Sequence, residues 1–311
     1  MVATVQYLKD RAGFPIKDSL KVLGLSKATF CRWAKDGGKP ERDNVTVPKS
    51  HWLLPWEKEA IIAYKREHPE VGYRRLAYMM LDEGVVAVTP SSVYRVLKEA
   101  GLASKWTPTG RGASKKGFDQ PSRPHEQWHT DIAYLNILGT HYFFIGVLDG
   151  YSRSIVHHEV RTDMTTLDVQ VVIERALEKL PFDAPRPRII TDNGGQYVAA
   201  EFKAYLRERD ISHSRAHPHH PQSNGKIERF HKSLKTECVR KKAMGSLDEA
   251  RMLISQYVDE YNNRRLHAAL NYLTPSDYLK GEEHISKRLL ERKQKLEAAR
   301  IERKKAWRKA A

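Results

Sequence analysis

Three acidic residues stand out because each lies in a distinctive run of polar and small residues. The three segments are 128–134 around Asp131, 189–197 around Asp192 and 224–230 around Glu228. Asp192 and Glu228 are separated by 35 residues. Carboxylates gathered in one site can hold divalent metal ions for phosphodiester chemistry. The sequence therefore predicts a metal-dependent catalytic site built from these acids.

Two Mg²⁺ ions about 3.5–4 Å apart would clamp the attacking and leaving oxygens of an in-line displacement. Hard oxygen ligands select Mg²⁺, with Mn²⁺ as a substitute, over zinc. We expect Asp131 in the middle of a strand, Asp192 at the end of a neighbouring strand and Glu228 on a helix. Such close acids should raise the pKa of at least one carboxyl group.

Each acid also has an ordinary structural interpretation. An aspartate at a strand end is commonly a turn or helix cap, and Glu228 lies between Lys226 and Arg229, where a surface ion pair is common. The three acids taken together, with their spacing and flanking residues, favour the metal site. Asp149 precedes Gly150 and is interpreted as part of a hairpin turn rather than as a fourth ligand.

Polar residues near the acids are candidates for contacts with DNA. On a helix expected to begin near residue 223, four side chains fall on one face, which would present an amide, a metal ligand and two cations to phosphate. These four are Asn224, Glu228, Lys232 and Lys235. Asn193 and Lys226 are further candidates, from the motifs of Asp192 and Glu228. The segment 216–223 is expected to be a mobile substrate loop, and its prolines disfavour a metal site formed by its histidines.

The order of elements around the acids predicts an RNase H-like α/β core over residues 127–240. Alternating and apolar patterns indicate three strands, a helix, a strand, a helix, a strand and a helix. Their expected ranges are 128–137, 141–148, 152–161, 165–180, 188–191, 201–209, 211–216 and a helix from about 223.

The regions on either side are predicted to be helical. Residues 1–42 suggest a helix-turn-helix in which Ser26 caps the second helix and Lys27 and Arg32 are exposed, although an ordinary helical hairpin is the alternative. A second helical unit spans 50–104, with helices at 56–67, 73–83 and 90–100. The segment 105–126 is expected to be a basic flexible linker. Residues 241–311 are helical and end in a basic tail.

Bulk composition narrows the classes of partner. The chain has 311 residues and a net charge of +16, which favours a polyanion such as nucleic acid. Neither a membrane span nor a signal peptide is apparent in the sequence. We therefore expect no membrane partner, and we expect a cytoplasmic location. The two cysteines, Cys31 and Cys238, suit a reducing compartment. Without a Cys-x-x-Cys pair, no structural zinc is expected.

The chain resembles the catalytic second-frame protein of IS3-family (IS3/IS481-like) insertion-sequence transposases, with a retroviral-type integrase core of the DDE class. The resembling segments are 23–26 with Trp33, 72–76, 128–131, 148–153, 191–197, 219–230 and 261–267. The resemblance implies that Asp131, Asp192 and Glu228 are the catalytic acids. It also implies nicking at transposon ends, then attack of the freed 3′-OH on target DNA.

The same resemblance extends to the second helical unit, which is similar to the second helix-turn-helix of these transposases. In that interpretation Ser91, Ser92 and Arg95 face double-stranded DNA, whereas Val93, Val96 and Leu97 belong to the core. Joining two transposon ends implies a homo-oligomer, at least a dimer, that works on the bacterial nucleoid.

Two other functions remain open from the sequence. One is a domesticated DNA-binding regulator with a silent core, which a lost acid would have favoured. The other is a nuclease or resolvase on the same fold, since fold alone does not decide function.

Overall fold

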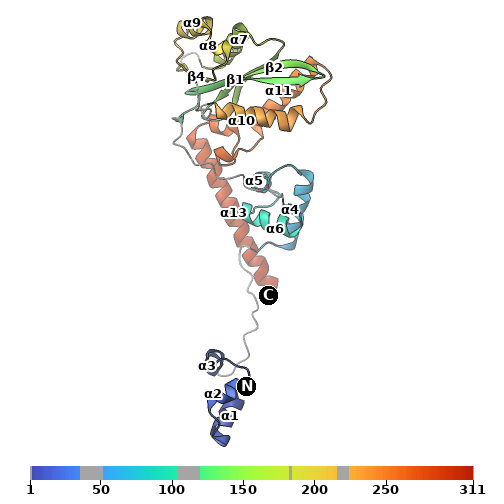
Figure 1. Ribbon diagram of the computed structural model, residues 1–311, viewed down its shortest axis with the longest axis vertical. Coiled ribbons are helices and arrows are strands. Elements are labelled where there is room, and N and C mark those ends of the chain that lie inside the picture. Colours follow the sequence, from blue (N-terminus) through green and yellow to red (C-terminus); the bar gives the residue numbers. More distant parts are fainter. Residues whose placement is uncertain (1, 36–51, 104–119, 182–183, 216–223, 311) are drawn as a thin grey trace. The chain divides into compact units, whose positions relative to one another are not determined.

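The computed structural model describes residues 2–35, 52–103, 120–181, 184–215 and 224–310. The predicted loop at 216–223 and most of the predicted linker at 105–126 lie outside these ranges. The chain separates into two compact units, residues 1–52 with 303–311, and residues 53–302 (Figure 1).

The first unit contains three short helices. These are α1 (Val2–Ala12), α2 (Ile16–Val22) and α3 (Lys27–Lys35). Val5, Leu20 and Phe30 form its small apolar core. The Ser26 hydroxyl accepts a hydrogen bond from the backbone N–H of Thr29 at 3.1 Å, so the predicted helix cap is confirmed.

The second unit begins with another three-helix module. Its helices are α4 (Pro55–Glu67), α5 (Tyr73–Glu83) and α6 (Pro90–Glu99). Val93, Val96 and Leu97 are buried in its core, as the apolar spacing predicted. Gly84 ends α5 with a positive φ of 73°, a left-handed conformation that glycine adopts without strain. The helix boundaries therefore follow from local sequence signals.

A mixed sheet forms the centre of the second unit. Its strands are β1 (Gln127–Ile137), β2 (Thr140–Asp149), β3 (Ile155–Arg161), β4 (Arg188–Thr191) and β5 (His213–Arg215). Their spatial order is β3-β2-β1-β4-β5. The first three strands are antiparallel, whereas β4 pairs in parallel with β1 and β5 in parallel with β4. The predicted α/β order is confirmed, which brings the strands of Asp131 and Asp192 side by side.

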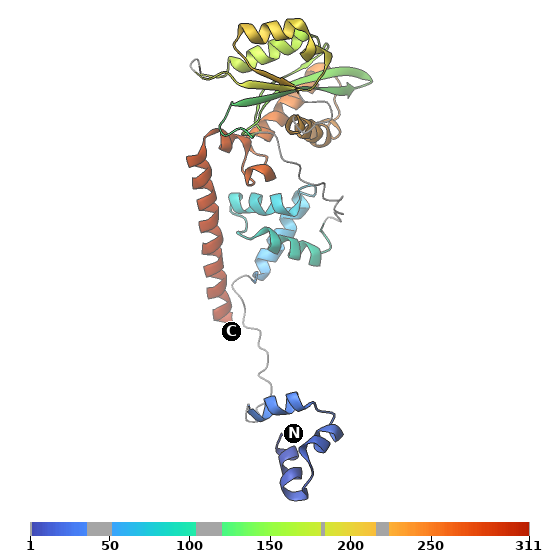
Figure 2. The same cartoon turned by 60° about the vertical axis from the view of Figure 1, so that its left-hand side comes forward.

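Helices cover both faces of this sheet (Figure 2). One layer holds α7 (Thr166–Leu177), α8 (Gly195–Val198) and α9 (Ala200–Glu208), and packs against Trp128, Ile145 and Ile189. The other layer holds α10 (Gly225–Leu234), the π-helical turn η2 (Lys235–Val239) and α11 (Leu247–Asn263). This second layer packs against Ala133, Leu135 and Phe144. Because strand side chains alternate, Asp131 lies on the α10 side.

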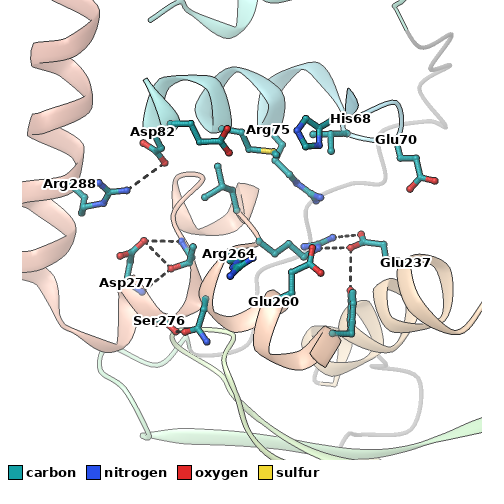
Figure 3. A pocket seen from close by; sticks show the side chains of 18 of the residues that line it. His68, Glu70, Arg75, Asp82, Glu237, Glu260, Arg264, Ser276, Asp277 and Arg288 are labelled. Carbon is teal, nitrogen blue, oxygen red and sulfur yellow. Dashed lines mark hydrogen bonds and ion pairs between the residues drawn. The ribbon is translucent and has the colours of Figure 1, made fainter. Parts of the chain in front are cut away.

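The C-terminal region is helical, as predicted. It contains η3 (Ala268–Leu270), α12 (Pro275–Leu279) and the 29-residue helix α13 (Glu282–Ala310). A cleft of about 810 Å³ lies where α5 approaches η2, α11 and the start of α13. Figure 3 shows that its lining is charged, with Arg75 and Asp82 on α5, Glu237 across from Arg75, and Arg288 of α13 beside Asp82. Within this unit, charged side chains therefore fill the boundary between the three-helix module and the core.

Candidate active site

Of the two aspartates of the predicted site, one lies within β1 and the other follows directly after the neighbouring strand β4. The parallel register of β1 and β4 pairs Trp128 with Ile189 and His129 with Ile190. Two residues further along each chain come Asp131 and Asp192. Strand β4 forms here because Ile189 and Ile190 are fully apolar and almost completely buried. The local sequence thus places both carboxylates at one position of the sheet.

Electrostatics agree with this proximity. Burial raises the pKa of Asp192 above its ordinary value, and the nearby negative charge of Asp131 raises it further. A hydrogen bond that the backbone N–H of Gly194 donates to Asp192 Oδ1 at 2.9 Å acts in the opposite direction. The pKa of Asp192 is thus raised as predicted, but burial is a larger cause than the neighbouring acid.

Glu228 approaches from the helical layer. It projects from α10 into an open cavity of about 430 Å³ that Asp131 also lines. The start of α10 is tied to β1, because the side-chain amide of Asn224 donates a hydrogen bond to the Thr130 carbonyl at 3.3 Å. Asp131 is therefore the common neighbour of the other two acids. In the described residues, however, no three acids are drawn close enough to form a ready-made metal cage.

The donor set nevertheless fits a hard divalent cation. Carboxylate oxygens are the ligands that Mg²⁺ and Mn²⁺ prefer. Burial mainly, and the charge of Asp131 to a smaller extent, raises the pKa of Asp192, and a bound cation would favour its charged form. Glu228 is exposed and lines the same cavity as Asp131.

Asp149 organises a turn through several hydrogen bonds, as its interpretation as a turn residue predicted. It is fully buried and accepts hydrogen bonds from the backbone N–H groups of His125 and Ser152, each at 2.8 Å. The Ser152 hydroxyl donates a third at 2.6 Å. With both carboxylate oxygens occupied, Asp149 shapes the turn between β2 and β3 rather than the metal site.

Three residues proposed to contact DNA have internal partners instead. Asn224 is 2% exposed and anchors α10, as described above. The Lys226 ammonium donates to the Gly150 carbonyl at 2.8 Å, and burial together with the neighbouring Arg153 lowers its pKa to about 7. Ser92 is buried and shares a hydrogen bond with Thr89. These side chains are turned toward the protein because they cap or anchor the elements that carry them.

The remaining candidates for DNA contact are accessible. Lys232 is exposed and Lys235 is half-buried, and both line the cavity of Asp131 and Glu228. The other candidates are exposed on their own elements: Lys27, Arg32, Ser91, Arg95 and Asn193.

Two residues of the cavity were not foreseen from the sequence. His231 lies on α10 with its Nδ1 atom 3.4 Å from Asp131 Oδ2. Arg240, just beyond η2, adds a further cation to the lining. The helical spacing of His231 from Glu228, three residues, was the signal available for it.

Three protein-family models match segments of the chain between residues 56 and 275. A family model described as an integrase core domain matches residues 121–221, and a second integrase core domain model matches residues 209–275. A model described as an HTH-like domain matches residues 56–108, which include α4, α5 and α6. The matched ranges follow one another along the second unit.

Curated relatives align over most of their length. The transposase InsF for insertion sequence IS3A of Escherichia coli (strain K12) is 25% identical over 285 residues, covering 87% of this chain and 96% of the relative. The insertion element IS407 uncharacterized 31.7 kDa protein of Burkholderia multivorans is 23% identical over 274 residues, covering 87% and 92%.

Among solved structures, the catalytic core domain of BIV integrase aligns with a TM-score of 0.42 and 19% identity, over 52% of this chain and 98% of that one. The integrase core models, the HTH-like model and the transposase relatives agree on one assignment. The matches to the integrase core domain and HTH-like models, together with the similarity to insertion-sequence transposases, support an IS3-family transposase of the DDE class.

Proposed function

We propose that this transposase binds the inverted repeats at transposon ends, nicks the DNA and joins the freed 3′-OH to a target phosphodiester. One observation carries the proposal most directly. Asp131 on β1 and Asp192 directly after the parallel strand β4 are close enough for the charge of Asp131 to raise the pKa of Asp192, and Glu228 lines the same cavity as Asp131.

Asp131, Asp192 and Glu228 would hold two Mg²⁺ ions, with Mn²⁺ as a substitute. When bound, such ions supply charge neutralisation at the phosphate and activation of the attacking oxygen. The protein contributes the fixed strands that present the two aspartates and the helix that brings Glu228 to them. No covalent bond between enzyme and DNA is required, because the nucleophile is water in the first reaction and a 3′-OH in the second.

DNA would be held by the accessible polar residues. Lys232 and Lys235 line the catalytic cavity and can neutralise backbone phosphates. Asn193 would lie beside Asp192, while the exposed residues of α3 and α6 would read the transposon ends. The residues proposed for α3 and α6 are Lys27, Arg32, Ser91 and Arg95. A net charge of +16 supports a DNA partner, and joining two ends requires at least a dimer.

This proposal divides the chain by task. Residues 1–42 and 50–104 would recognise DNA, 127–240 would carry out catalysis, and 241–311 would supply a helical region with a basic tail. Residues 105–126 would link recognition to catalysis. A bacterial DNA substrate would place the work in the cytoplasm, at the nucleoid. The described residues contain no helix that is long and apolar enough to cross a membrane.

The test uses a labelled duplex carrying the inverted repeat that flanks the gene, in Mg²⁺ and in EDTA. The proteins compared are wild type, Glu228→Gln and Glu201→Gln, whose carboxylate is exposed on α9 outside the cavity. We expect nicked and joined products with wild type and Glu201→Gln in Mg²⁺ alone, and none with Glu228→Gln.

Other outcomes would point to other functions. Specific binding without cleavage by any of the three proteins would favour a DNA-binding regulator. Nicking without joined products, and without preference for the inverted repeat, would favour a nuclease. Products that persist with Glu228→Gln would rule out the proposed active site.

A further inference from the structure

We infer that His231 is a positioning residue that fixes the carboxylate of Asp131. This inference rests on the proposed function, because it concerns a carboxylate that would bind metal. The two oxygens of Asp131 have separate neighbours. Oδ1 accepts a hydrogen bond from the backbone N–H of Ile132 at 2.9 Å, and Oδ2 lies 3.4 Å from His231 Nδ1. Rotation of the carboxylate is thus opposed from both sides.

The His231 ring is itself held by aromatic neighbours. It is 7% exposed and makes edge-to-face contacts with Phe144, at a centroid distance of 5.8 Å, and with Phe230, at 6.0 Å. Phe144 can lie there because residue 146 is glycine. A Cβ atom at Gly146 would come within 2.6 Å of the Phe144 ring. Gly146 is also the β2 partner of Asp131, so ring and carboxylate share one patch of the sheet.

The surroundings of the two ring nitrogens indicate that His231 interacts with Asp131 through Nδ1. Nε2 is buried and has no hydrogen-bond partner among the described residues. A core histidine kept for its hydrogen bonds would satisfy both nitrogens. Here Asp131 is the polar neighbour that the ring faces, through Nδ1. A neutral ring with its proton on Nδ1 would donate toward the carboxylate, and this tautomer leaves Nε2 as the buried acceptor.

The position of His231 along the chain adds a second argument. It lies three residues after Glu228 on α10, so one helix carries a proposed metal ligand and the group that orients another. Neighbours of metal-binding carboxylates that hold them in place typically change metal affinity by about 10–100-fold when replaced. The alternative role for His231 is simply to fill space between Phe144 and Phe230.

Two substitutions separate these roles because they keep different halves of the side chain. His231→Phe keeps the aromatic ring and its packing but removes the donor. His231→Asn removes much of the ring but places an amide N–H near the position of Nδ1. We would measure Mn²⁺ affinity of the full chain without DNA, by the electron paramagnetic resonance signal of free Mn²⁺. The melting temperature in EDTA would be recorded in parallel.

The positioning role predicts that His231→Phe weakens Mn²⁺ binding by about 10–100-fold with little change in melting temperature. It also predicts that His231→Asn keeps most of the affinity despite a lower melting temperature. The reverse order, with normal affinity for His231→Phe and the larger loss for His231→Asn, would assign His231 to packing and overturn the inference.

Asp131→Asn distinguishes failure of the inference from failure of the proposed function. If wild type binds Mn²⁺ and Asp131→Asn does not, the metal site stands and the two His231 variants decide the inference alone. If wild type and Asp131→Asn bind Mn²⁺ equally well, or if neither binds it, the proposed metal site is wrong and the inference is overturned with it.

Discussion

Arg292 holds Asp82 through two hydrogen bonds at once. Its Nε atom donates to Oδ1 at 2.8 Å and its Nη2 atom donates to Oδ2 at 2.5 Å. Both side chains are largely buried, at 5% and 17% exposure. Arg292 also donates to the carbonyls of Asn271 and Tyr272. One guanidinium on α13 therefore joins the end of α5 to the turn after η3.

Arg292→Ala should destabilise the docking of α5 against α13. Removing one partner of a buried ion pair typically costs about 3–5 kcal/mol, and we expect less here because Asp82 keeps a longer ion pair with Arg288 at 3.6 Å. We expect faster hydrogen exchange in α4, α5 and α6, and a lower free energy of unfolding in urea. Lys293→Ala, one position along and exposed, is the control. Equal exchange in the two variants would show that the pair does not hold the module.

The cations near the active site should differ in their effect on DNA binding. Lys232→Gln and Lys235→Gln should each weaken DNA binding. Each should also reduce the slope of the logarithm of the binding constant against the logarithm of the salt concentration by about one, as expected when a phosphate contact is lost. Lys226→Met should leave the slope unchanged but lower the melting temperature, because its ammonium is bonded to the Gly150 carbonyl. Fluorescence anisotropy over a salt series measures these slopes. A reduced slope for Lys226→Met would contradict this expectation and indicate that Lys226 contacts DNA phosphate.

Stability should fall below neutral pH because of His158. Burial lowers its pKa from 6.5 to about 4. Between these values the unfolded chain binds a proton that the folded chain does not, so stability is full above about pH 6.5 and declines toward pH 4, by up to about 1.4 kcal/mol per pH unit.

His158→Phe should reduce this decline. The substitution removes the titrating group and keeps the stacking on Phe144, whose centroid is 5.6 Å from that of His158. Denaturation in urea at pH 4.5 to 7.5 gives the free energy of unfolding for each protein. Parallel pH profiles for wild type and variant would contradict the prediction. His267 and the carboxyl groups are present in both proteins, so they contribute equally to the two profiles.

Gly146→Ala should destabilise the core. The added methyl group would meet the Phe144 ring at 2.6 Å, so the ring must shift, and such overpacking typically costs about 1–3 kcal/mol. Gly225→Ala is the matched control, since no atom lies within 4 Å of its added Cβ and the helix gains from alanine. Thermal unfolding should show a loss for the first variant and none for the second.

Local signals were enough to predict several elements. The helix at 73–83 is bounded by Gly72 and Gly84, and the strand at 188–191 has an apolar centre, so both were predicted to the residue. The third strand begins at Ile155 rather than at residue 152. That difference arises from Asp149, whose bond to the N–H of His125 fixes the turn across 24 positions of sequence.

Helical spacing predicted part of the lining of the cavity around Glu228 but not which of its side chains are buried. Helical spacing correctly grouped Glu228, Lys232 and Lys235 along one cavity. It also grouped Asn224 with them, because spacing gives direction around a helix and not depth within the fold. The burial of Asn224 and Lys226 depends on β1 and on the turn after β2, and periodicity within a single helix contains no information about either.

The helix that carries Glu228 continues directly into η2, where Glu237 receives two hydrogen bonds from Arg265 and borders the cleft facing Arg75. The two glutamates are nine positions apart on one continuous helical rod and line different cavities, Glu228 that of Asp131 and Glu237 the charged cleft. Because the rod is continuous, tilting it to seat a substrate at one side must displace the charges at the other. The cavity of Glu228 and the charged cleft beside the three-helix module are thus joined by one unbroken helical segment.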